Sequence, residues 1–281
     1  MRMILRRITA ADAPAAGEFL ESRTLVLRWL VAFFQHFRAL PAEEEPYWSL
    51  WRGDGFGADG IQCVAAHFFQ TATTYVCAEP TCDLSTIEDL LDEELLPEKV
   101  VGDRATLDRW RAERPSFANR VSEWKDIVVL ENRSCEEMPG GTPLFRRATT
   151  ADLPVLEQYG HLLETEVGEE VPGDFESLIE HGLLFVAEDG GCVKGYVRSN
   201  FSDGRFVHAG GLYVHPLYRG KGVGSALARG LAAQVRRETG ACVLLDAYGE
   251  NLAALKAYER AGFLRVGSGL EARFEEGVWE G

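Results

Sequence analysis

The sequence predicts a mixed α/β fold in two domains, each with a central sheet flanked by helices. The chain has 281 residues, enough for two domains of ordinary size. Short apolar runs typical of strands alternate with helical patterns along most of it, and 46% of the residues are hydrophobic, as in proteins with packed cores. Residues 131–143 have no periodicity and contain two prolines and a Gly-Gly pair. We therefore expect domains at 1–132 and 143–281, with a linker at 133–142.

A nine-residue pattern occurs once in each predicted domain. Residues 6–14 (Arg-Arg-Ile-Thr-Ala-Ala-Asp-Ala-Pro) and 146–154 (Arg-Arg-Ala-Thr-Thr-Ala-Asp-Leu-Pro) agree at six of nine positions, 140 residues apart. Each predicts a short strand that turns into a helix, because Thr and Asp are favoured N-caps and Pro is favoured in the first turn. A good helix start can recur by chance, but a match at half the chain length favours two copies of one fold.

Charge and cysteine content argue against several classes of protein. The chain has 29 Lys and Arg against 44 Asp and Glu, and both halves are acidic, so we expect no nucleic acid partner. The most apolar stretch, 25–37, contains Arg28 and is too short to span a membrane. The six cysteines lie mostly in apolar runs and the chain opens without an apolar signal core, so we expect a cytoplasmic protein with reduced thiols. His67, Cys77 and Cys82 lack a fourth ligand at the usual spacing, so no metal site is expected.

The second domain has the clearer pattern of elements. We expect strands at 145–148, 183–187, 192–199, 206–214 and 242–246, two closing strands after residue 262, and helices at 151–165, 174–182, 225–239 and 252–261. Gly210-Gly211 inside the strand expected at 206–214 predicts a bulge or a close approach by another backbone or a ligand.

The first domain shows similar elements less clearly. We expect one or two helices up to residue 37, strands at 47–52, 61–70, 74–78 and 127–130, and helices at 87–95 and 105–112. The string Arg52-Gly-Asp-Gly-Phe-Gly57 could suggest a phosphate loop, but the chain continues after it as a strand, so it predicts a hairpin turn.

A glycine-rich loop between a strand and a helix carries the clearest chemistry. In Arg219-Gly-Lys-Gly-Val-Gly224, alternating glycines let successive backbone N–H groups turn toward one point, and the helix that follows directs its positive dipole end there. That arrangement suits phosphate oxygens, and Arg219 and Lys221 add positive charge. A Walker loop is excluded because Gly222 follows Lys221. A dinucleotide fingerprint is closer, since Asp246 lies about 20 residues on, but Ser225 stands where its third glycine belongs.

Two motifs together resemble the GCN5-related N-acetyltransferases. Leu212-Tyr-Val-His-Pro216 followed by Arg219-Gly-Lys-Gly-Val-Gly224 is similar to that family's pyrophosphate loop. Asn251-x-x-Ala-x-x-x-Tyr258-x-x-x-Gly-Phe263 resembles its second motif. The resemblance covers 212–263 strongly and 144–281 weakly. It implies a tandem form with a degenerate N-terminal copy, and in each copy a mostly antiparallel, twisted sheet.

The resemblance also implies a set of functional residues. Acetyl-CoA would be the cosubstrate, and Tyr258 would give a proton to its sulfur. The base is expected at His208, where the family commonly has a glutamate, and an imidazole can do this work. Glu166 and Glu169 lie in an acidic stretch, with Glu164 and Glu170, where the family shapes its acceptor site. The residues expected to hold acetyl-CoA are Leu212, Tyr213, Val214, Arg219, Gly220, Lys221, Gly222, Val223, Gly224, Ser225, Asn251 and Tyr258.

Each of these residues also has a structural interpretation. Tyr258 could be a core aromatic, His208 a half-buried strand residue, and Asn251 only a helix N-cap. The glutamates could be a solvated helix end.

We therefore expect an N-acetyltransferase that moves an acetyl group from acetyl-CoA to a small-molecule or peptide amine, as a monomer or homodimer. The alternative is a non-catalytic acyl-CoA-binding sensor or scaffold. We expect the first domain to have lost acetyl-CoA binding and to serve as a packing partner or as a wall of the acceptor cleft.

Overall fold

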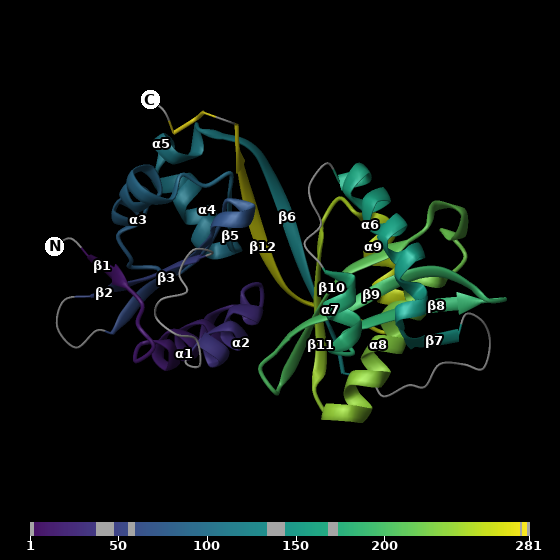
Figure 1. The fold of residues 1–281 in the computed structure, drawn as a ribbon. Coiled ribbons are helices and arrows are strands. Elements are labelled where there is room, and N and C mark those ends of the chain that lie inside the picture. Colours follow the sequence, from purple (N-terminus) through teal and green to yellow (C-terminus); the bar gives the residue numbers. More distant parts are fainter. Residues whose placement is uncertain are drawn as a thin grey trace. The chain divides into compact units, whose positions relative to one another are not determined.

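The computed structural model describes residues 3–37, 48–55, 60–133, 144–167, 174–275 and 277–279. Most of the predicted linker therefore lies outside the described residues. The chain forms two compact units: Met1–Val129 with Tyr248–Glu250 and Val266–Gly281, and Leu130–Ala247 with Asn251–Arg265. Figure 1 labels their elements.

The first unit contains a mixed sheet and helices from the first half of the chain. Its strand order is β1-β2-β3-β4-β5-β12, and β12 (Leu264–Phe274) comes from the end of the chain. The pairs are antiparallel except for β4/β5, which is parallel. A core cluster beneath α3, α4 and α5 includes the stacked rings of Trp110 and Phe117. The elements are β1 (Ile4–Arg7), α1 (Ala13–Arg23), α2 (Arg28–Phe37), β2 (Trp48–Asp54), β3 (Ile61–Phe68), β4 (Thr73–Ala78), α3 (Leu84–Leu90), β5 (Lys99–Asp103), α4 (Arg104–Glu113), α5 (Pro115–Ala118) and β6 (Val121–Asn132).

The second unit repeats this plan. Its strand order is β7-β8-β9-β10-β11, again antiparallel except for the last pair, β10/β11. The elements are β7 (Leu144–Arg147), α6 (Leu153–Val167), α7 (Phe175–Glu180), β8 (Leu184–Asp189), β9 (Cys192–Ser202), β10 (Phe206–Val214), α8 (Val223–Thr239), β11 (Cys242–Tyr248) and α9 (Leu252–Arg260). The mostly antiparallel sheet and the two copies of one fold are as predicted.

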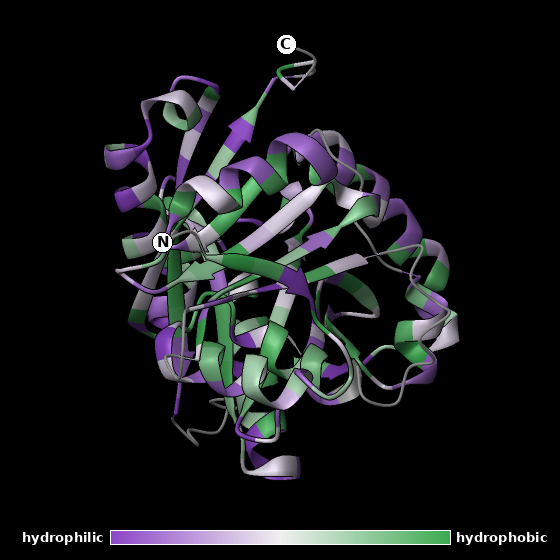
Figure 2. Ribbon diagram, turned by 90° about the vertical axis from the view of Figure 1, so that its left-hand side faces the viewer, coloured by the Kyte–Doolittle hydropathy of each residue, from purple (hydrophilic) through white to green (hydrophobic). Residues whose placement is uncertain are grey.

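Helices α6 and α8 cover opposite faces of the second sheet. Tyr213 of β10 packs against Tyr159 of α6, with ring centroids 5.5 Å apart. Its neighbours Leu212 and Val214 instead lie 3.8 and 3.7 Å from the position that a Cβ on Gly224 of α8 would take. Side chains alternate between the faces of a strand, so the two helices lie on different sides. Figure 2 colours the ribbon by hydropathy and shows that the helices carry both hydrophobic and hydrophilic residues.

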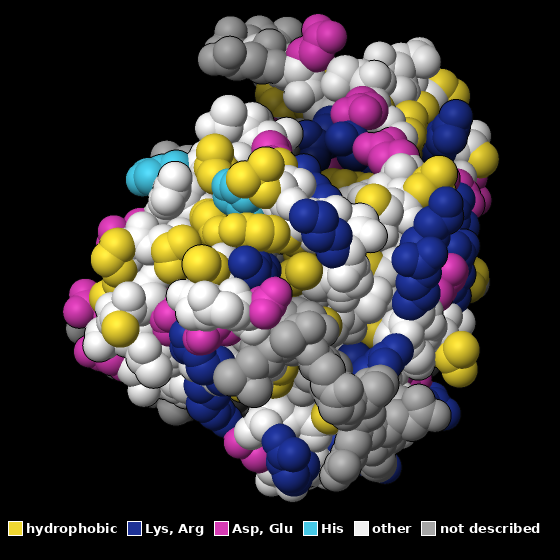
Figure 3. Space-filling model, turned by 90° about the vertical axis from the view of Figure 1, so that its right-hand side faces the viewer, with side chains coloured by type: hydrophobic (Ala, Val, Ile, Leu, Met, Phe, Trp, Pro, Cys, Tyr) yellow, Lys and Arg dark blue, Asp and Glu magenta, His cyan; other side chains and the backbone are white. Residues whose placement is uncertain are grey.

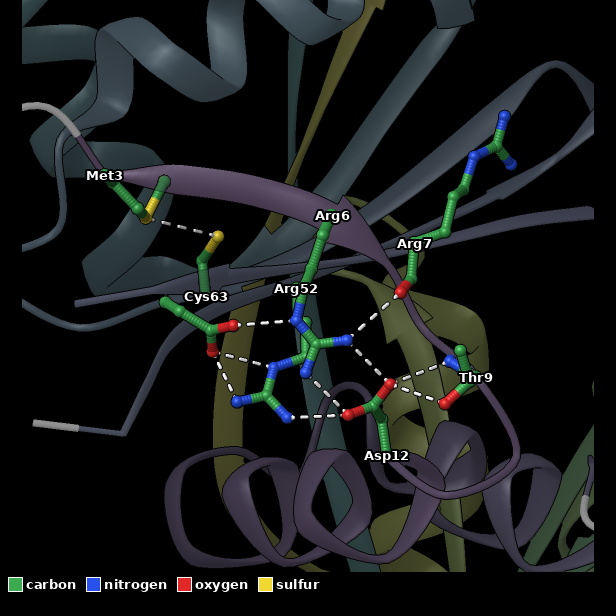
Figure 4. A network of polar contacts seen from close by, with 8 residues as sticks. Met3, Arg6, Arg7, Thr9, Asp12, Arg52 and Cys63 are labelled. Atoms are coloured by element: carbon green, nitrogen blue, oxygen red, sulfur yellow. Dashed lines mark hydrogen bonds and ion pairs between the residues drawn. The ribbon is translucent and has the colours of Figure 1, made fainter. Parts of the chain in front are cut away.

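The repeated nine-residue pattern forms the same network in both units. The guanidinium of Arg6 donates two hydrogen bonds to the carboxylate of Asp12, at 2.7 and 2.8 Å (Figure 4). Arg146 makes the same pair of contacts with Asp152, also at 2.7 and 2.8 Å. In each unit the threonine three residues before the aspartate donates its backbone N–H to that carboxylate. The network joins the first strand to the start of the first helix, which explains why these residues recur.

Asp152→Asn tests how much this network stabilises the second unit. The hydrogen bonds from Arg146, and its charge, lower the pKa of Asp152 from 3.8 to about 2. Because the folded pKa is depressed, the stabilisation is present above about pH 4 and is lost as the pH falls toward 2. We expect Asp152→Asn to lower the free energy of unfolding by about 2 kcal/mol at pH 7. Urea unfolding should show this loss at pH 7 and a much smaller one near pH 2. The same loss at both pH values would contradict the assignment, and exposed Asp189→Asn serves as the control.

Several elements differ from the sequence prediction. Helix α5 was not predicted, and β6 is longer than the expected strand at 127–130. Strand β5 was not predicted, because its five residues lie directly between a helix and α4, whose N-cap is Asp103. Helix α8 begins at Val223 rather than at residue 225. The end of the chain forms one long strand, β12, instead of two, because Gly269 marks a close approach rather than a turn: a Cβ there would lie 2.7 Å from the carbonyl oxygen of Gly102.

The compact units also divide the chain differently from the expected boundaries. Strand β12 comes from the second half of the sequence but pairs with β5, with Gly269 opposite Asp103 and Arg273 opposite Lys99. In Figure 1 it lies, in yellow, beside the strands of the first unit. Residues 266–281 thus belong to the first unit, although the predicted second domain, 143–281, includes them.

Candidate functional site

The glycine-rich loop of the second unit forms an open cradle of backbone at a helix N-terminus. Gly220 and Gly222 have φ values of +73° and +85°, and Gly222 is the N-cap of the 17-residue helix α8. Among the described residues, nothing lies within 4 Å of the position that a Cβ would take on either glycine. Glycine is therefore required here for its backbone conformation and not for packing. The first backbone N–H groups of a helix have no partner within the helix, so the start of α8, with the positive end of its dipole, suits phosphate oxygens.

The charged side chains of the loop already have partners in the protein. Arg219 donates from Nε to the carbonyl of Val214 at 2.8 Å and from a terminal nitrogen to both oxygens of Glu166, at 2.7 and 2.8 Å. The Lys221 Nζ donates to the carbonyl of Leu217 at 3.0 Å and is exposed. Glu166, expected to attract an amine, thus holds Arg219, while Glu169 lies outside the described residues.

Strand β10 separates from β11 beside this loop. The parallel ladder joins Phe206 to Cys242 and His208 to Leu244, and its register stops there. On the other edge the register with β9 shifts between Gly210 and Tyr213, where Gly211 has a φ of +56°. The predicted bulge is therefore present. Beyond His208, residues 212–214 do not pair with β11 in the described ladder. Their backbone groups can therefore contact a bound molecule.

The two glycines of the bulge make room for side chains from β9. A Cβ on Gly210 would lie 2.6 Å from Nδ2 of Asn200, and a Cβ on Gly211 would lie 2.9 Å from Nε of Arg198. Both β9 side chains therefore lie across the bulge. Asn200 and Arg198 were not singled out from the sequence. The signal that could have found them is that they are two residues apart in a strand and so lie on the same face of β9, opposite to buried Val197.

His208 contacts a carboxylate from the next strand. Its Nε2 lies 2.7 Å from Oδ1 of Asp246, and its Nδ1 lies 3.4 Å from Nδ2 of Asn200. The side chain of His208 is 20% exposed and that of Asp246 is 45% exposed, so both are accessible to solvent. In the sequence analysis, Asp246 appeared only as the acidic residue of a dinucleotide-binding fingerprint, which the motif does not match.

Tyr258 lies on α9 with its side chain almost fully buried. The residue is 7% exposed, and its ring packs against Phe263. Burial raises the pKa of the phenol well above its usual range, and the charge of Asp246 adds to this effect. Tyr258 is therefore a protonated phenol at neutral pH, as a proton donor must be. In the described part of the chain, no side chain hydrogen-bonds to its hydroxyl.

The other predicted site residues take several positions. Asn251 is the N-cap of α9, and its Oδ1 accepts from the backbone N–H of Ala254 at 3.1 Å. Val223 is buried, and Ser225 lies half-buried in the first turn of α8. Tyr213 is 2% exposed, so only its backbone is available to a ligand. The hydroxyl of Tyr196 is buried and has no hydrogen-bond partner among the described residues.

The corresponding loop of the first unit has no such cradle. Residues 79–83, between β4 and α3, contain no glycine. The side chain of Asp83 caps α3, accepting from the N–H of Ser85 at 3.0 Å, so a carboxylate lies where an anion would bind. The loop is also held by Arg109, which donates to the carbonyl of Cys82 at 3.0 Å. The 52–57 string lies at the hairpin of β2 and β3, as predicted from its sequence, although residues 56–59 are outside the described ranges.

Many basic side chains of the second unit are paired with acids. Arg146 contacts Asp152, Arg147 contacts Glu238, and Arg265 contacts Glu259. Figure 3 shows basic side chains next to acidic ones on one face. Within the described ranges, no three His, Cys, Asp or Glu side chains group as they would around a metal ion. The helices of those ranges include none long and apolar enough to cross a membrane.

Comparisons with known proteins agree with this geometry. The model of the acetyltransferase (GNAT) family matches residues 151–263. No curated protein matches the sequence. Similar solved structures include a GCN5-related N-acetyltransferase from Sphaerobacter thermophilus, with 18% identity, coverage of 97% of this chain and 95% of that chain, and a TM-score of 0.63. An acetyltransferase of the GNAT family from Colwellia psychrerythraea has 14% identity, coverage of 97% and 100%, and a TM-score of 0.59.

A third similar structure has two copies of the domain. It is a tandem GNAT protein from the clavulanic acid biosynthesis pathway, with 13% identity, coverage of 97% of this chain and 98% of that chain, and a TM-score of 0.57. At such identities the likeness shows the fold alone, but it extends over nearly the whole chain. The protein described here therefore has a tandem GNAT fold, and its residues 151–263 form a domain of the acetyltransferase (GNAT) family.

Proposed function

We propose that the second unit binds acetyl-CoA and catalyses transfer of its acetyl group to a primary amine. The observation that carries the proposal is the positive-φ glycine cradle at the N-terminus of α8, directly after a bulged strand that separates from β11. Backbone groups of residues 219–225 would hold the pyrophosphate, and those of residues 212–214 would hold the pantetheine arm, with Asn251 beside it. When bound, acetyl-CoA supplies the acetyl group as an activated thioester.

Two side chains would handle the protons of this reaction. His208 would accept a proton from the amine nitrogen as the new C–N bond forms. Tyr258 would give its phenolic proton to the sulfur as the C–S bond breaks, and its burial keeps that proton in place at neutral pH. Backbone N–H groups near the bulge would stabilise the carbonyl oxygen as it gains charge.

Glu166 and Glu169 are proposed as acceptor contacts. Because Glu166 is engaged with Arg219, it could bind an amine only when that ion pair opens. A direct assay with different amines identifies the class of amine.

Release of the CoA thiol in the presence of a panel of amines tests the proposal. The panel comprises polyamines, amino acids, aminoglycosides and peptide N-termini, and CoA alone is tested in parallel for thermal stabilisation. We expect stabilisation by CoA and amine-dependent thiol release. Stabilisation without turnover on any amine would favour the non-catalytic sensor, for which the burial of Tyr258 is the supporting observation. Stabilisation by NAD and not by CoA would contradict both.

We also expect one acetyl-CoA per chain. The first unit presents Asp83 where the second presents an open glycine cradle, and a carboxylate there repels phosphate. Isothermal titration calorimetry with CoA measures the stoichiometry directly. Two sites per chain would show that the first unit has kept a binding site.

A further inference from the structure

The contact between His208 and Asp246 determines which imidazole nitrogen carries the proton. Nε2 of His208 lies 2.7 Å from Oδ1 of Asp246. An ionised carboxylate can only accept a hydrogen bond, so Nε2 must be the donor. In the neutral ring the lone pair is then on Nδ1.

The lone pair on Nδ1 faces the bulge of β10. The nearest amide is Nδ2 of Asn200, at 3.4 Å, which is long for a hydrogen bond. That same Nδ2 lies 2.6 Å from the position that a Cβ on Gly210 would take, so the amide rests on the bulge. An incoming amine or water can replace so weak a partner.

The position of the pair in the sheet explains why the contact forms. His208 is the last residue of β10 in the described ladder and lies opposite Leu244, two residues before Asp246. Side chains two residues apart point to the same face of a strand, so Asp246 lies beside His208 where the strands begin to separate. An ion pair this exposed adds little to the free energy of unfolding, so the contact is better explained by a role in the site than by stability.

We propose that Asp246 is a positioning residue that holds His208 with its proton on Nε2, so that Nδ1 is the atom that takes the proton of the acceptor amine. This inference rests on the proposed function. As the proton arrives on Nδ1, the imidazole becomes a cation whose charge Asp246 balances. Two other titratable groups lie near the pair: Arg198 from β9 lies across the bulge at Gly211, and Tyr258 from α9, on whose pKa the charge of Asp246 acts, stays neutral.

Asp246→Asn tests the proposal without a bound ligand. Nitrogen-15 NMR of labelled histidine distinguishes the two neutral tautomers, and His208→Gln identifies the signal of His208 among the six histidines. Above the pH at which the ring titrates, we expect the Nε2–H form in the wild type. In Asp246→Asn we expect the Nδ1–H form to gain, because the amide can donate to Nε2. Asp189→Asn, which removes an exposed carboxylate elsewhere in the second unit, should leave the signal unchanged.

Kinetics with an amine that the wild type acetylates provides the second readout. We expect kcat to fall about 100-fold in Asp246→Asn, with little change in KM for acetyl-CoA, and Asp246→Glu to restore part of it. A variant whose tautomer and kcat match those of Asp189→Asn would overturn the inference. A wild type without turnover on any amine would instead overturn the proposed function.

Discussion

Replacing Tyr258 with phenylalanine should lower kcat by about two orders of magnitude while leaving the affinity for CoA nearly unchanged. The phenol is buried, has a raised pKa and makes no side-chain hydrogen bond within the described ranges, so its proton is available to a leaving thiolate. Phenylalanine fills the same space against Phe263 and removes only the hydroxyl. Steady-state kinetics with a responsive amine, together with calorimetric titration of CoA, measures both quantities.

A fall in kcat without a change in CoA affinity distinguishes a proton donor from a residue that only packs in the core. If Tyr258 is only a core aromatic, the variant should lose stability or nothing, and turnover should be within a few-fold of the wild type. That result would remove Tyr258 from the proposed mechanism and leave the binding site intact.

Gly222→Ala should weaken CoA binding at least tenfold. Gly222 is the N-cap of α8 with a φ of +85°, a conformation that costs an alanine roughly 1 kcal/mol. A Cβ at this position would project into the open cradle where backbone N–H groups are expected to meet the pyrophosphate. The dissociation constant of CoA and the melting temperature are measured on the same protein.

Gly240→Ala is the matched control, because Gly240 is the C-cap of the same helix. It has a φ of +74°, and no atom of the described part of the chain lies within 4 Å of the position that its Cβ would take. We expect a similar loss of stability from Gly240→Ala with no change in CoA affinity. Equal losses of affinity in both variants would mean that the cradle acts only through the stability of α8.

The features that the sequence predicted well are those that depend on neighbouring residues. The glycine loop, the helix that follows it and the Asn251 cap are set by spacings of a few residues, and the structure has them. The repeated Arg-Arg-x-Thr-x-x-Asp pattern predicted two copies of one fold for the same reason. Its contacts, Arg6 with Asp12 and Arg146 with Asp152, join residues six positions apart.

Features that depend on strand register could not be predicted in this way. Strand β12 pairs with β5, which lies more than 150 residues earlier in the chain, and local periodicity contains no information about that partner. The glycines of β12 resembled a turn, although Gly269 is required by a close backbone contact. The division into compact units depended on this pairing.

The same distinction between local patterns and long-range contacts applies to the candidate site. The sequence by itself determined that the second half carries a phosphate-type cradle and a tyrosine on the helix that follows β11, because both are local patterns. Only the tertiary structure decided that Arg219 is held by Glu166, 53 residues away, and that His208 meets Asp246, 38 residues away. A charge or a base acts through the groups that it contacts, and those contacts are set by how strands and helices align after the chain has folded.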